Sequence, residues 1–468
     1  MASIITKGHE LSTAVEQVVQ LFFDLHSDFT AQSSVEDGKI ITRIENNGQV
    51  GEGSYPAPEG ADKKQLSDCI KKSALLACQK ISDMPTPWGI STGIRPAKTA
   101  RMLIDEGKAE AEVLRFMENE YWIESPRAKL CLDVAKKERA ILDLANEKSV
   151  SLYVGIPFCP TRCAYCSFIS QALTHNNKFM MPYVEACEKE IRRCGEIADK
   201  LGLKPISAYF GGGTPTAIPP EQLQRLIEML KSSFDMSDLR ELTVEAGRPD
   251  TLTPEMMEML QSCGVRRISI NPQTMHQCTL DAIGRRHSPE DVERAFALAR
   301  EYGVEIINAD LILGLPGETP AMLEETLDRI TALNPEAITV HTMYMKRAAR
   351  LKNDFEKLRF ARNVNEMMEL CRSRMAVYGA EPYYMYKQKN TLGNLENIGF
   401  AKPGSECLYN IYIMEEVHSI IAMGGGASTK LVRGDRIERI FNPKEAGDYV
   451  NRIDEILEKK QYIAEFLG

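Results

Sequence analysis

The sequence predicts an α/β protein in which a partial (β/α)6 barrel of the TIM type lies between an N-terminal α+β domain and a C-terminal, mostly helical domain. From about residue 150 to residue 340, six short apolar runs alternate with longer amphipathic stretches, which is typical of parallel strands joined by crossover helices. Six units are too few for a closed eight-fold barrel, so a partial barrel or an open sheet is expected. The predicted domains are 1–148, 149–345 and 346–468.

The first domain combines helical spacing with one hairpin signal, Asn46-Asn47-Gly48. A Pro- and Gly-rich connection, Pro85–Pro96, interrupts regular structure before helical patterns resume as far as about Lys148. The remaining elements expected here are a helix over Ser12–His26 with Ser12 as N-cap, strands over Lys39–Glu45 and Gln49–Tyr55, and a helix over Lys63–Lys80.

The central domain supplies the strands of the barrel, and its chemistry belongs at their carboxyl ends. The expected strands are Ser151–Ile156, Ile206–Phe210, Glu241–Glu245, Arg267–Ile270, Ile306–Leu313 and Ala337–Val340. The expected helices are Glu221–Ser232, Pro254–Cys263, Pro289–Tyr302 and Ala321–Leu333. Past Tyr344 we expect helices over Phe355–Tyr378, Met414–Ala422 and Pro443–Lys460 and a strand over Tyr383–Tyr386.

Composition narrows the class of function. The net charge is −9, whereas a nucleic-acid partner favours a basic surface, so nucleic acid is not expected as a partner. No apolar run approaches the roughly 20 residues that cross a bilayer. The twelve cysteines are scattered without a signal segment, which indicates reduced thiols in the cytoplasm, some of them metal ligands.

The strongest chemical signal is a group of three cysteines directly after the first barrel strand, in Cys159-Pro-Thr-Arg-Cys163-Ala-Tyr-Cys166. Three thiolates at this spacing can hold one face of an iron–sulfur cubane and leave one iron open to a ligand. The alternative is a structural zinc ion, which takes four protein ligands, and this run offers three. We therefore expect a [4Fe–4S] cluster on Cys159, Cys163 and Cys166.

This Cys-x₃-Cys-x₂-Cys loop, with the aromatic Tyr165 before its third cysteine, resembles the radical S-adenosylmethionine (SAM) superfamily. The resemblance implies the partial (β/α)6 barrel of that superfamily and two cofactors, the [4Fe–4S] cluster and SAM on its open iron. Reduction of the cluster cleaves SAM to methionine and a 5′-deoxyadenosyl radical in that superfamily. The cofactor would carry the hard chemistry, and the protein would position it.

Polar and glycine residues at the following strand ends are further site candidates, each with an ordinary alternative. Gly211-Gly212-Gly213-Thr214 lets backbone groups approach a ligand, although such runs are more often turns. Asp310 lies in an apolar strand, where a charge needs a partner. The other candidates are Glu245, Gln273, Arg285, His341 and Tyr344. Their ordinary alternatives are, in the same order, a surface helix cap, a loop residue, a solvated cation and, for the last two, core residues.

The order of these pieces from Ser151 to Tyr344 resembles the oxygen-independent coproporphyrinogen III dehydrogenase (oxidase) branch of the superfamily. By position, Tyr153, Gly212 and Glu245 match residues around the cluster-bound SAM. The residues that match a second SAM site are Gly213, Thr214, Gln273, Arg285, Asp310 and Tyr344. Within the branch the HemZ type is the best match, through Trp88–Pro96, Cys159–Cys163 and Gln388–Gly399.

Two departures keep more than one function open. Phe168 stands where the best-known dehydrogenases have a further cysteine. The HemW-type heme chaperones also lack that cysteine, but their His-Asn-x-x-Tyr-Trp motif is absent, and Tyr386–Asn390 occupies the comparable region.

The leading hypothesis is a radical SAM oxidoreductase of heme biosynthesis that decarboxylates the propionates of rings A and B of coproporphyrinogen III to give protoporphyrinogen IX. The alternatives are a heme-binding or heme-delivery protein of the HemW type, and a radical SAM enzyme acting on another tetrapyrrole. The implied partners are a tetrapyrrole and a reducing donor such as flavodoxin or ferredoxin. The substrate carboxylates need cations, and the candidates are Arg95, Lys98, Lys387 and Lys389, each of which could instead be an ordinary surface charge. The run Gly424–Ser428 is either a tight turn or a ligand contact.

Overall fold

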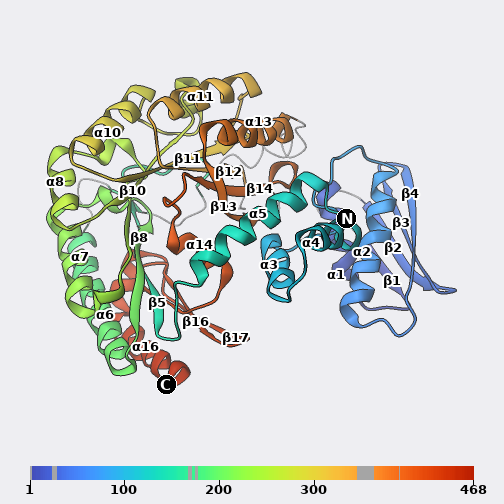
Figure 1. Cartoon of the computed structure of the whole chain (residues 1–468), viewed down its shortest axis with the longest axis horizontal. Coiled ribbons are helices and arrows are strands. Elements are labelled where there is room, and N and C mark those ends of the chain that lie inside the picture. Colours follow the sequence, from blue (N-terminus) through green and yellow to red (C-terminus); the bar gives the residue numbers. More distant parts are fainter. Residues whose placement is uncertain (1–2, 24–28, 167–170, 174–177, 345–362, 389–390) are drawn as a thin grey trace. The chain divides into compact units, whose positions relative to one another are not determined.

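The computed structural model describes residues 3–23, 29–166, 171–173, 178–344, 363–388 and 391–468. These residues form two compact units (Figure 1). The first contains the described residues up to Lys136 together with those of Tyr386–Glu396, and the second contains the others. This division differs from the three predicted domains because most of the C-terminal strands extend the central sheet instead of forming a separate body.

The first unit contains a four-stranded sheet in the order β1-β2-β3-β4, with helices α1 and α2 packed on it. β1 is parallel to β2, and the other pairs are antiparallel. The predicted hairpin is confirmed, because Asn46 pairs with Gln49 across the turn. The bounds are β1 Ser3–Lys7, α1 Ser12–Phe22, β2 Phe29–Glu36, β3 Lys39–Asn46, β4 Gln49–Pro56 and α2 Lys63–Gln79.

The predicted N-cap of the first helix is wrong. Leu11 occupies the N-cap of α1 and Ser12 is its first helical residue. The Leu11 amide donates to His9 Nδ1 at 3.2 Å, so an imidazole satisfies this amide at the helix start and no hydroxyl cap forms. The part of the predicted helix at 24–26 lies outside the described residues. The second helix begins as its sequence indicates, with a capping box between Asp62 and Gln65.

The rest of the first unit is helical and is held by a buried charged group. Glu396 accepts a hydrogen bond from Trp88 Nε1 at 2.8 Å and pairs with Arg127 at 3.0 Å. Lys387 is buried too: its ammonium lies over the Trp88 ring and donates to the Ser91 carbonyl at 2.7 Å, which argues against a role in holding substrate. Burial lowers the pKa of Lys387 to about 7. The helices are α3 Pro96–Asp105, α4 Glu110–Tyr121 and α5 Ser125–Leu142, and the residues of α5 after Lys136 belong to the second unit.

The second unit is built on an 11-stranded sheet whose centre is the predicted parallel set, in the order β5-β8-β9-β10-β11-β12. All six predicted strands and all four predicted helices are confirmed, and Figure 1 shows the helices along the outside of the curved sheet. The strands are β5 Ser149–Ile156, β8 Lys204–Gly212, β9 Glu241–Glu245, β10 Arg267–Gln273, β11 Ile306–Leu313 and β12 Ala337–Thr342. The helices are α6 Met180–Leu201, α7 Pro220–Ser233, α8 Pro254–Ser262, α9 Gln277–Ala282, α10 Pro289–Glu301 and α11 Pro320–Ala332.

C-terminal strands extend both edges of this parallel set. β14 pairs antiparallel with β12, and β15 pairs parallel with β5. The predicted helix Met414–Ala422 is wrong, because α14 ends at Glu415 and the buried run Ile420–Gly424 is a strand inserted between β5 and β16. The predicted strand at Tyr383–Tyr386 is confirmed within β13, whereas the start of the helix predicted from Phe355 lies outside the described residues. The bounds are α13 Asn363–Tyr378, β13 Glu381–Lys387, β14 Glu396–Ala401, α14 Leu408–Glu415, β15 Ile420–Gly424, β16 Ser428–Arg433, β17 Arg436–Phe441, α15 Ala446–Asn451 and α16 Ile453–Leu467.

Among the described residues, every helix is too short or too polar to span a bilayer.

The buried pair of the first unit yields a prediction about stability. We expect Glu396→Gln to lower the free energy of unfolding of this unit by about 3 kcal/mol, because the buried Arg127 loses its counter-charge. Both tryptophans of the chain, Trp88 and Trp122, belong to this unit, so tryptophan fluorescence during urea unfolding reports on it. The exposed pair of Lys136 with Glu110 provides the control, and Glu110→Gln should leave the midpoint unchanged. Equal midpoints for both variants would contradict the prediction.

Candidate cluster and cofactor site

The cysteine loop leaves the carboxyl end of β5 and is held at several points along its main chain. Cys159 ends the short strand β6 (Phe158–Cys159), which pairs in parallel with β7 (Gln171–Ala172). The amide of Cys166 donates to the carbonyl of Cys163 at 3.2 Å, and the amide of Ala164 donates to Ile283 at 2.9 Å. All three cysteines are half-buried, and their thiols form no disulfide.

The glycine segment after β8 packs directly against this loop. The amide of Gly213 donates to Ile156 at 2.8 Å, and the amide of Thr214 donates to Phe158 at 2.7 Å. The Thr214 hydroxyl lies 3.5 Å from Cys159 Sγ. A Cβ at Gly213 would stand 2.5 Å from the Phe158 carbonyl oxygen, so a side chain there would displace the loop. Gly212 has φ +108°, a conformation that favours glycine.

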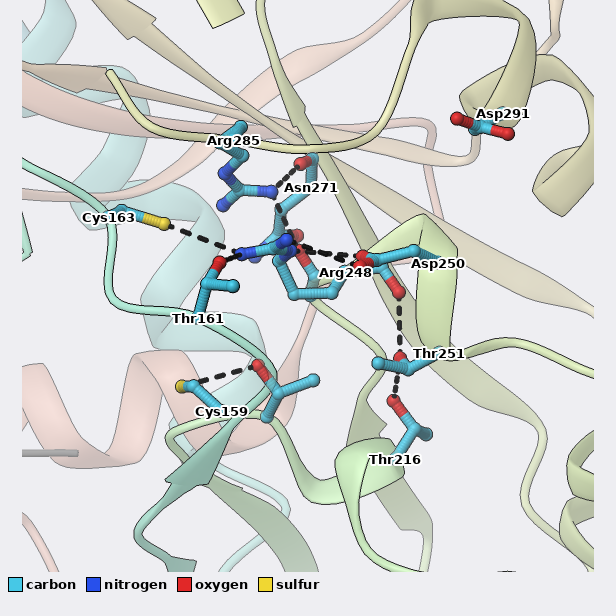
Figure 2. Close-up of polar contacts among 12 residues, drawn as sticks. Cys159, Thr161, Cys163, Thr216, Arg248, Asp250, Thr251, Asn271, Arg285 and Asp291 are labelled. Atoms are coloured by element: carbon cyan, nitrogen blue, oxygen red, sulfur yellow. Dashed lines mark hydrogen bonds and ion pairs between the residues drawn. The ribbon is translucent and has the colours of Figure 1, made fainter. Parts of the chain in front are cut away.

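A buried arginine that the sequence analysis missed faces the loop from the end of β9. Figure 2 shows Arg248 between Asp250 on one side and Thr161 and Cys163 on the other. Its guanidinium contacts the two Asp250 oxygens at 3.0 and 3.2 Å, the Thr161 hydroxyl at 2.9 Å and Cys163 Sγ at 3.8 Å. The sequence feature that could have identified Arg248 as a site residue is its position three residues after Glu245, just past the end of a barrel strand. The guanidinium therefore places a positive charge beside a predicted cluster ligand.

The structure brings together two predicted site residues, Arg285 and Tyr165. The Tyr165 hydroxyl accepts from Arg285 Nε at 3.2 Å and from Nη2 at 2.9 Å. Arg285 Nη1 donates to the carbonyls of Gly247 and Asn271 at 3.0 and 2.7 Å (Figure 2). The alternative of a solvated cation is excluded, since Arg285 is buried. Arg285 could bind a ligand carboxylate through two guanidinium nitrogens only by giving up its hydrogen bonds to Tyr165.

Two buried acceptors at the end of β10 have no hydrogen-bond partner among the described residues. Gln273 has φ +68° beside an irregularity in the pairing of β10 with β11, and its Oε1 makes no hydrogen bond. Asn271 Oδ1 makes none either, and sequence reasoning had passed over this residue. Buried polar atoms are almost always satisfied, so these two oxygens are available to accept from a bound ligand or a water.

Glu245 lies inside the barrel, so the reading as a surface helix cap is excluded. Its Oε1 accepts from the Tyr209 hydroxyl at 2.6 Å. Burial raises the pKa of Glu245 to about 7, and the charge of Asp310 adds to the rise. Asp310 in turn accepts from Asn308 Nδ2 at 2.7 Å and lies 3.8 Å from His341 Nε2. The predicted residues Glu245, Asp310 and His341 therefore share one neighbourhood.

Tyr153 lies in an aromatic stack that also escaped sequence reasoning. Its ring centroid is 6.2 Å from that of Tyr209 and 5.8 Å from that of Tyr409, with near-parallel planes. Tyr409 comes from α14, far along the chain. The Tyr153 hydroxyl is 3.4 Å from the position that a Cβ on Gly212 would take, so the stack adjoins the glycine segment. Tyr344 follows β12 by two residues at the same edge and is half-buried.

The donor set fits a [4Fe–4S] cluster with one open iron. Three thiols are available on one loop, and thiolates are the usual ligands of such clusters. In the described ranges, no three His, Cys, Asp or Glu side chains gather as they would around one metal ion. A cubane instead binds its three thiolates at three separate irons. The residues that would hold SAM are those of the glycine segment, Glu245 and the orphan acceptors Asn271 and Gln273.

This fold and site define a radical SAM protein, and the comparisons agree. Residues 153–330 match the model of the radical SAM superfamily. The chain is 39% identical to the oxygen-independent coproporphyrinogen-III oxidase-like protein HemZ of Bacillus subtilis, over 85% of this chain and 81% of that protein. The chain therefore belongs to the radical SAM superfamily and, within it, to the family of HemZ.

Other relatives carry different names. The chain is 34% identical to the heme chaperone HemW of Bacillus subtilis, over 56% of this chain and 66% of that protein. Among solved structures, coproporphyrinogen III oxidase (HemN) from Escherichia coli aligns with a TM-score of 0.54 at 24% identity, over 68% of this chain and 72% of that one. This last similarity supports the fold. The radical SAM family uses a [4Fe–4S] cluster and SAM, the two cofactors that the resemblance implied.

The ligand assignment predicts the loss of the cluster on removal of one thiol. We expect Cys163→Ala, reconstituted anaerobically, to lose the cluster absorbance and all SAM cleavage while keeping its circular dichroism spectrum. Cys278 is exposed and lies outside the loop, so Cys278→Ala should keep the iron content of the natural protein. Full iron content in Cys163→Ala would contradict the assignment of Cys163 as a cluster ligand.

The environment of Glu245 predicts a pH dependence of stability. The folded state holds this proton up to a pKa of about 7, whereas the unfolded state releases it near 4.5. Stability therefore falls as pH rises through this window, by up to about 3 kcal/mol. Glu245→Gln keeps an acceptor for Tyr209 without a titrating proton, so its advantage over the natural apo-protein should grow from pH 5 to pH 7.5. Urea unfolding followed by circular dichroism would measure it, and parallel pH curves would contradict it.

Proposed function

We propose that this chain catalyses the oxidative decarboxylation of the ring A and ring B propionates of coproporphyrinogen III, giving protoporphyrinogen IX. The observation that carries the proposal is the cysteine loop packed on the glycine segment, with unsatisfied acceptors at the end of β10, in a chain that matches a coproporphyrinogen-III oxidase-like relative over most of its length. The loop would hold the cluster, the glycine segment and the acceptors would contact SAM, and the relative supports a tetrapyrrole as the substrate class.

Each propionate that becomes a vinyl group loses one β-hydrogen atom, one molecule of carbon dioxide and one electron. When bound, the cluster and SAM supply a 5′-deoxyadenosyl radical, which can take a hydrogen atom from such a carbon. A reducing donor of the flavodoxin or ferredoxin class would start each turnover, and a one-electron acceptor would take the electron that the substrate gives up.

The protein's own residues would position these groups and adjust their charge. Arg248 lies beside Cys163 and offsets negative charge on the loop. The Asn271 and Gln273 oxygens would accept N–H or O–H donors of the cofactor. Glu245, with its raised pKa, can hold or release a proton near neutral pH while its Oε1 accepts from the Tyr209 hydroxyl.

The second candidate is heme handling without turnover, which the 34% identity to a HemW heme chaperone favours. A third is radical chemistry on another tetrapyrrole. Both keep the cysteine loop, so the iron content cannot separate the three candidates. Products and stoichiometric heme binding can.

An anaerobic assay of the reconstituted protein with reductant, SAM and coproporphyrinogen III tests the proposal. We expect protoporphyrinogen IX, a three-carboxylate intermediate and 5′-deoxyadenosine in proportion to vinyl groups formed, separated by chromatography. The Cys163→Ala variant supplies the blank.

Deoxyadenosine without a decarboxylated porphyrin would overturn the coproporphyrinogen assignment in favour of another tetrapyrrole. No SAM cleavage by a protein with a full cluster, together with one heme bound per chain in an absorbance titration, would overturn it in favour of heme handling.

A further inference from the structure

A buried tyrosine joins three segments next to the cysteine loop. Tyr183, in α6, donates from its hydroxyl to the carbonyl of Gly155 near the end of β5. The same hydroxyl accepts from the amide of Gly425 at 2.7 Å. Its ring packs edge-on against Phe158, the residue before the first cysteine, with centroids 5.2 Å apart. One side chain therefore fixes β5, the glycine turn at Gly424–Gly426 and the start of the loop.

At the end of β15, Gly424 leaves no room for a side chain. A Cβ at Gly424, whose φ is +91°, would stand 2.2 Å from the Gly155 carbonyl oxygen and 2.8 Å from the Tyr183 hydroxyl. A Cβ at Gly155 would stand 2.8 Å from the Gly425 carbonyl oxygen. The sequence allowed Gly424–Ser428 to be either a tight turn or a ligand contact. In the structure Gly424 packs against β5, the strand that leads into the cysteine loop.

A fully buried carboxylate holds this turn from behind. Glu190, also in α6, accepts from the Gly424 amide at 2.8 Å and from Asn442 Nδ2 at 2.8 Å. It also accepts from the Tyr449 hydroxyl at 2.5 Å and pairs with Lys460 at 3.0 Å. Asn442 adds a bond to the Gly424 carbonyl at 2.8 Å. A buried ion pair is retained at a desolvation cost, so its many specific bonds suggest a role in fixing geometry.

We propose that Tyr183 and Glu190 are positioning residues for the cluster and SAM site: through the turn Gly424–Gly426 they fix the end of β5, and with it Phe158 and Cys159 against Gly213 and Thr214. The inference rests on the cofactor site under the proposed function and is independent of which tetrapyrrole is used. Loss of the clamp loosens the step from Gly155 to Cys159, which is where the loop meets the segment that would hold SAM.

Tyr183→Phe tests the clamp with little disturbance, since the ring stays against Phe158 and only the bridging hydroxyl is lost. Two polar groups, the Gly155 carbonyl and the Gly425 amide, then lack their partner. In the apo-protein we expect hydrogen exchange of the amides in 153–159 and 424–427 to accelerate about tenfold. In the reconstituted protein we expect an unchanged iron content, an altered EPR signal of the reduced cluster and a SAM dissociation constant raised about tenfold.

The matched control is Tyr412→Phe. Tyr412 is equally buried in the same unit, and its hydroxyl donates to the Ile141 carbonyl at 3.0 Å, so the change removes the same kind of bond at another place. This variant should share any loss of global stability but leave the exchange of 153–159 and the affinity for SAM unchanged. Asn442→Ala removes the second of the two links between Glu190 and the turn, while the direct bond from the Gly424 amide stays, so it should move both measurements in the direction of Tyr183→Phe.

Equal effects of Tyr183→Phe and Tyr412→Phe would overturn the proposal in favour of a general contribution to stability. Unchanged exchange and unchanged SAM affinity in Tyr183→Phe would overturn it outright. Exchange of the apo-protein and SAM binding require no substrate, so failure of the coproporphyrinogen assay would leave this test intact.

Discussion

The site depends on the close packing of one main-chain segment on another. β5 and β8 pair in parallel with Ile156 opposite Gly212, and the chain then continues that contact with the amides of Gly213 and Thr214 on the loop carbonyls. No side chain fits between the two segments, so the distance is set by backbone hydrogen bonds. The thiol ligands and the glycine segment that faces the cofactor are therefore positioned by one contact.

Two buried arginines, Arg248 and Arg285, place positive charge beside the cysteine loop. Burying a guanidinium is costly unless its donors are satisfied. Arg248 meets that requirement through Asp250 and Thr161, and Arg285 through two backbone carbonyls and Tyr165. Both cations therefore keep fixed positions beside the cysteine loop. Cysteine binds iron as the negatively charged thiolate, so positive charge fixed beside the loop offsets the charge of its ligand set.

Local patterns predicted the barrel well because its strands and helices are defined by their own periodicity. The predicted bounds of β9 and β11 coincide with those of the structure. The helix predicted over Met414–Ala422 includes the first three residues of β15, whose apolar sequence does not distinguish helix from strand and whose state is decided by its pairing with β5. Arg248 and Asn271 were missed for a related reason: their sequences look ordinary, and their roles arise only where separate strand ends meet.

The C-terminal strands also explain why six barrel strands suffice. Without β15, β5 would be an edge strand with an unpaired row of backbone groups, and edge strands are prone to fray and to mispair. β15 pairs with β5 from Ile420–Ser151 to Gly424–Gly155, so the covered row ends four residues before Cys159. The loop thus departs from a strand paired on both sides. The C-terminal third of the chain is in this sense part of the cluster site, although it contributes no thiol to it.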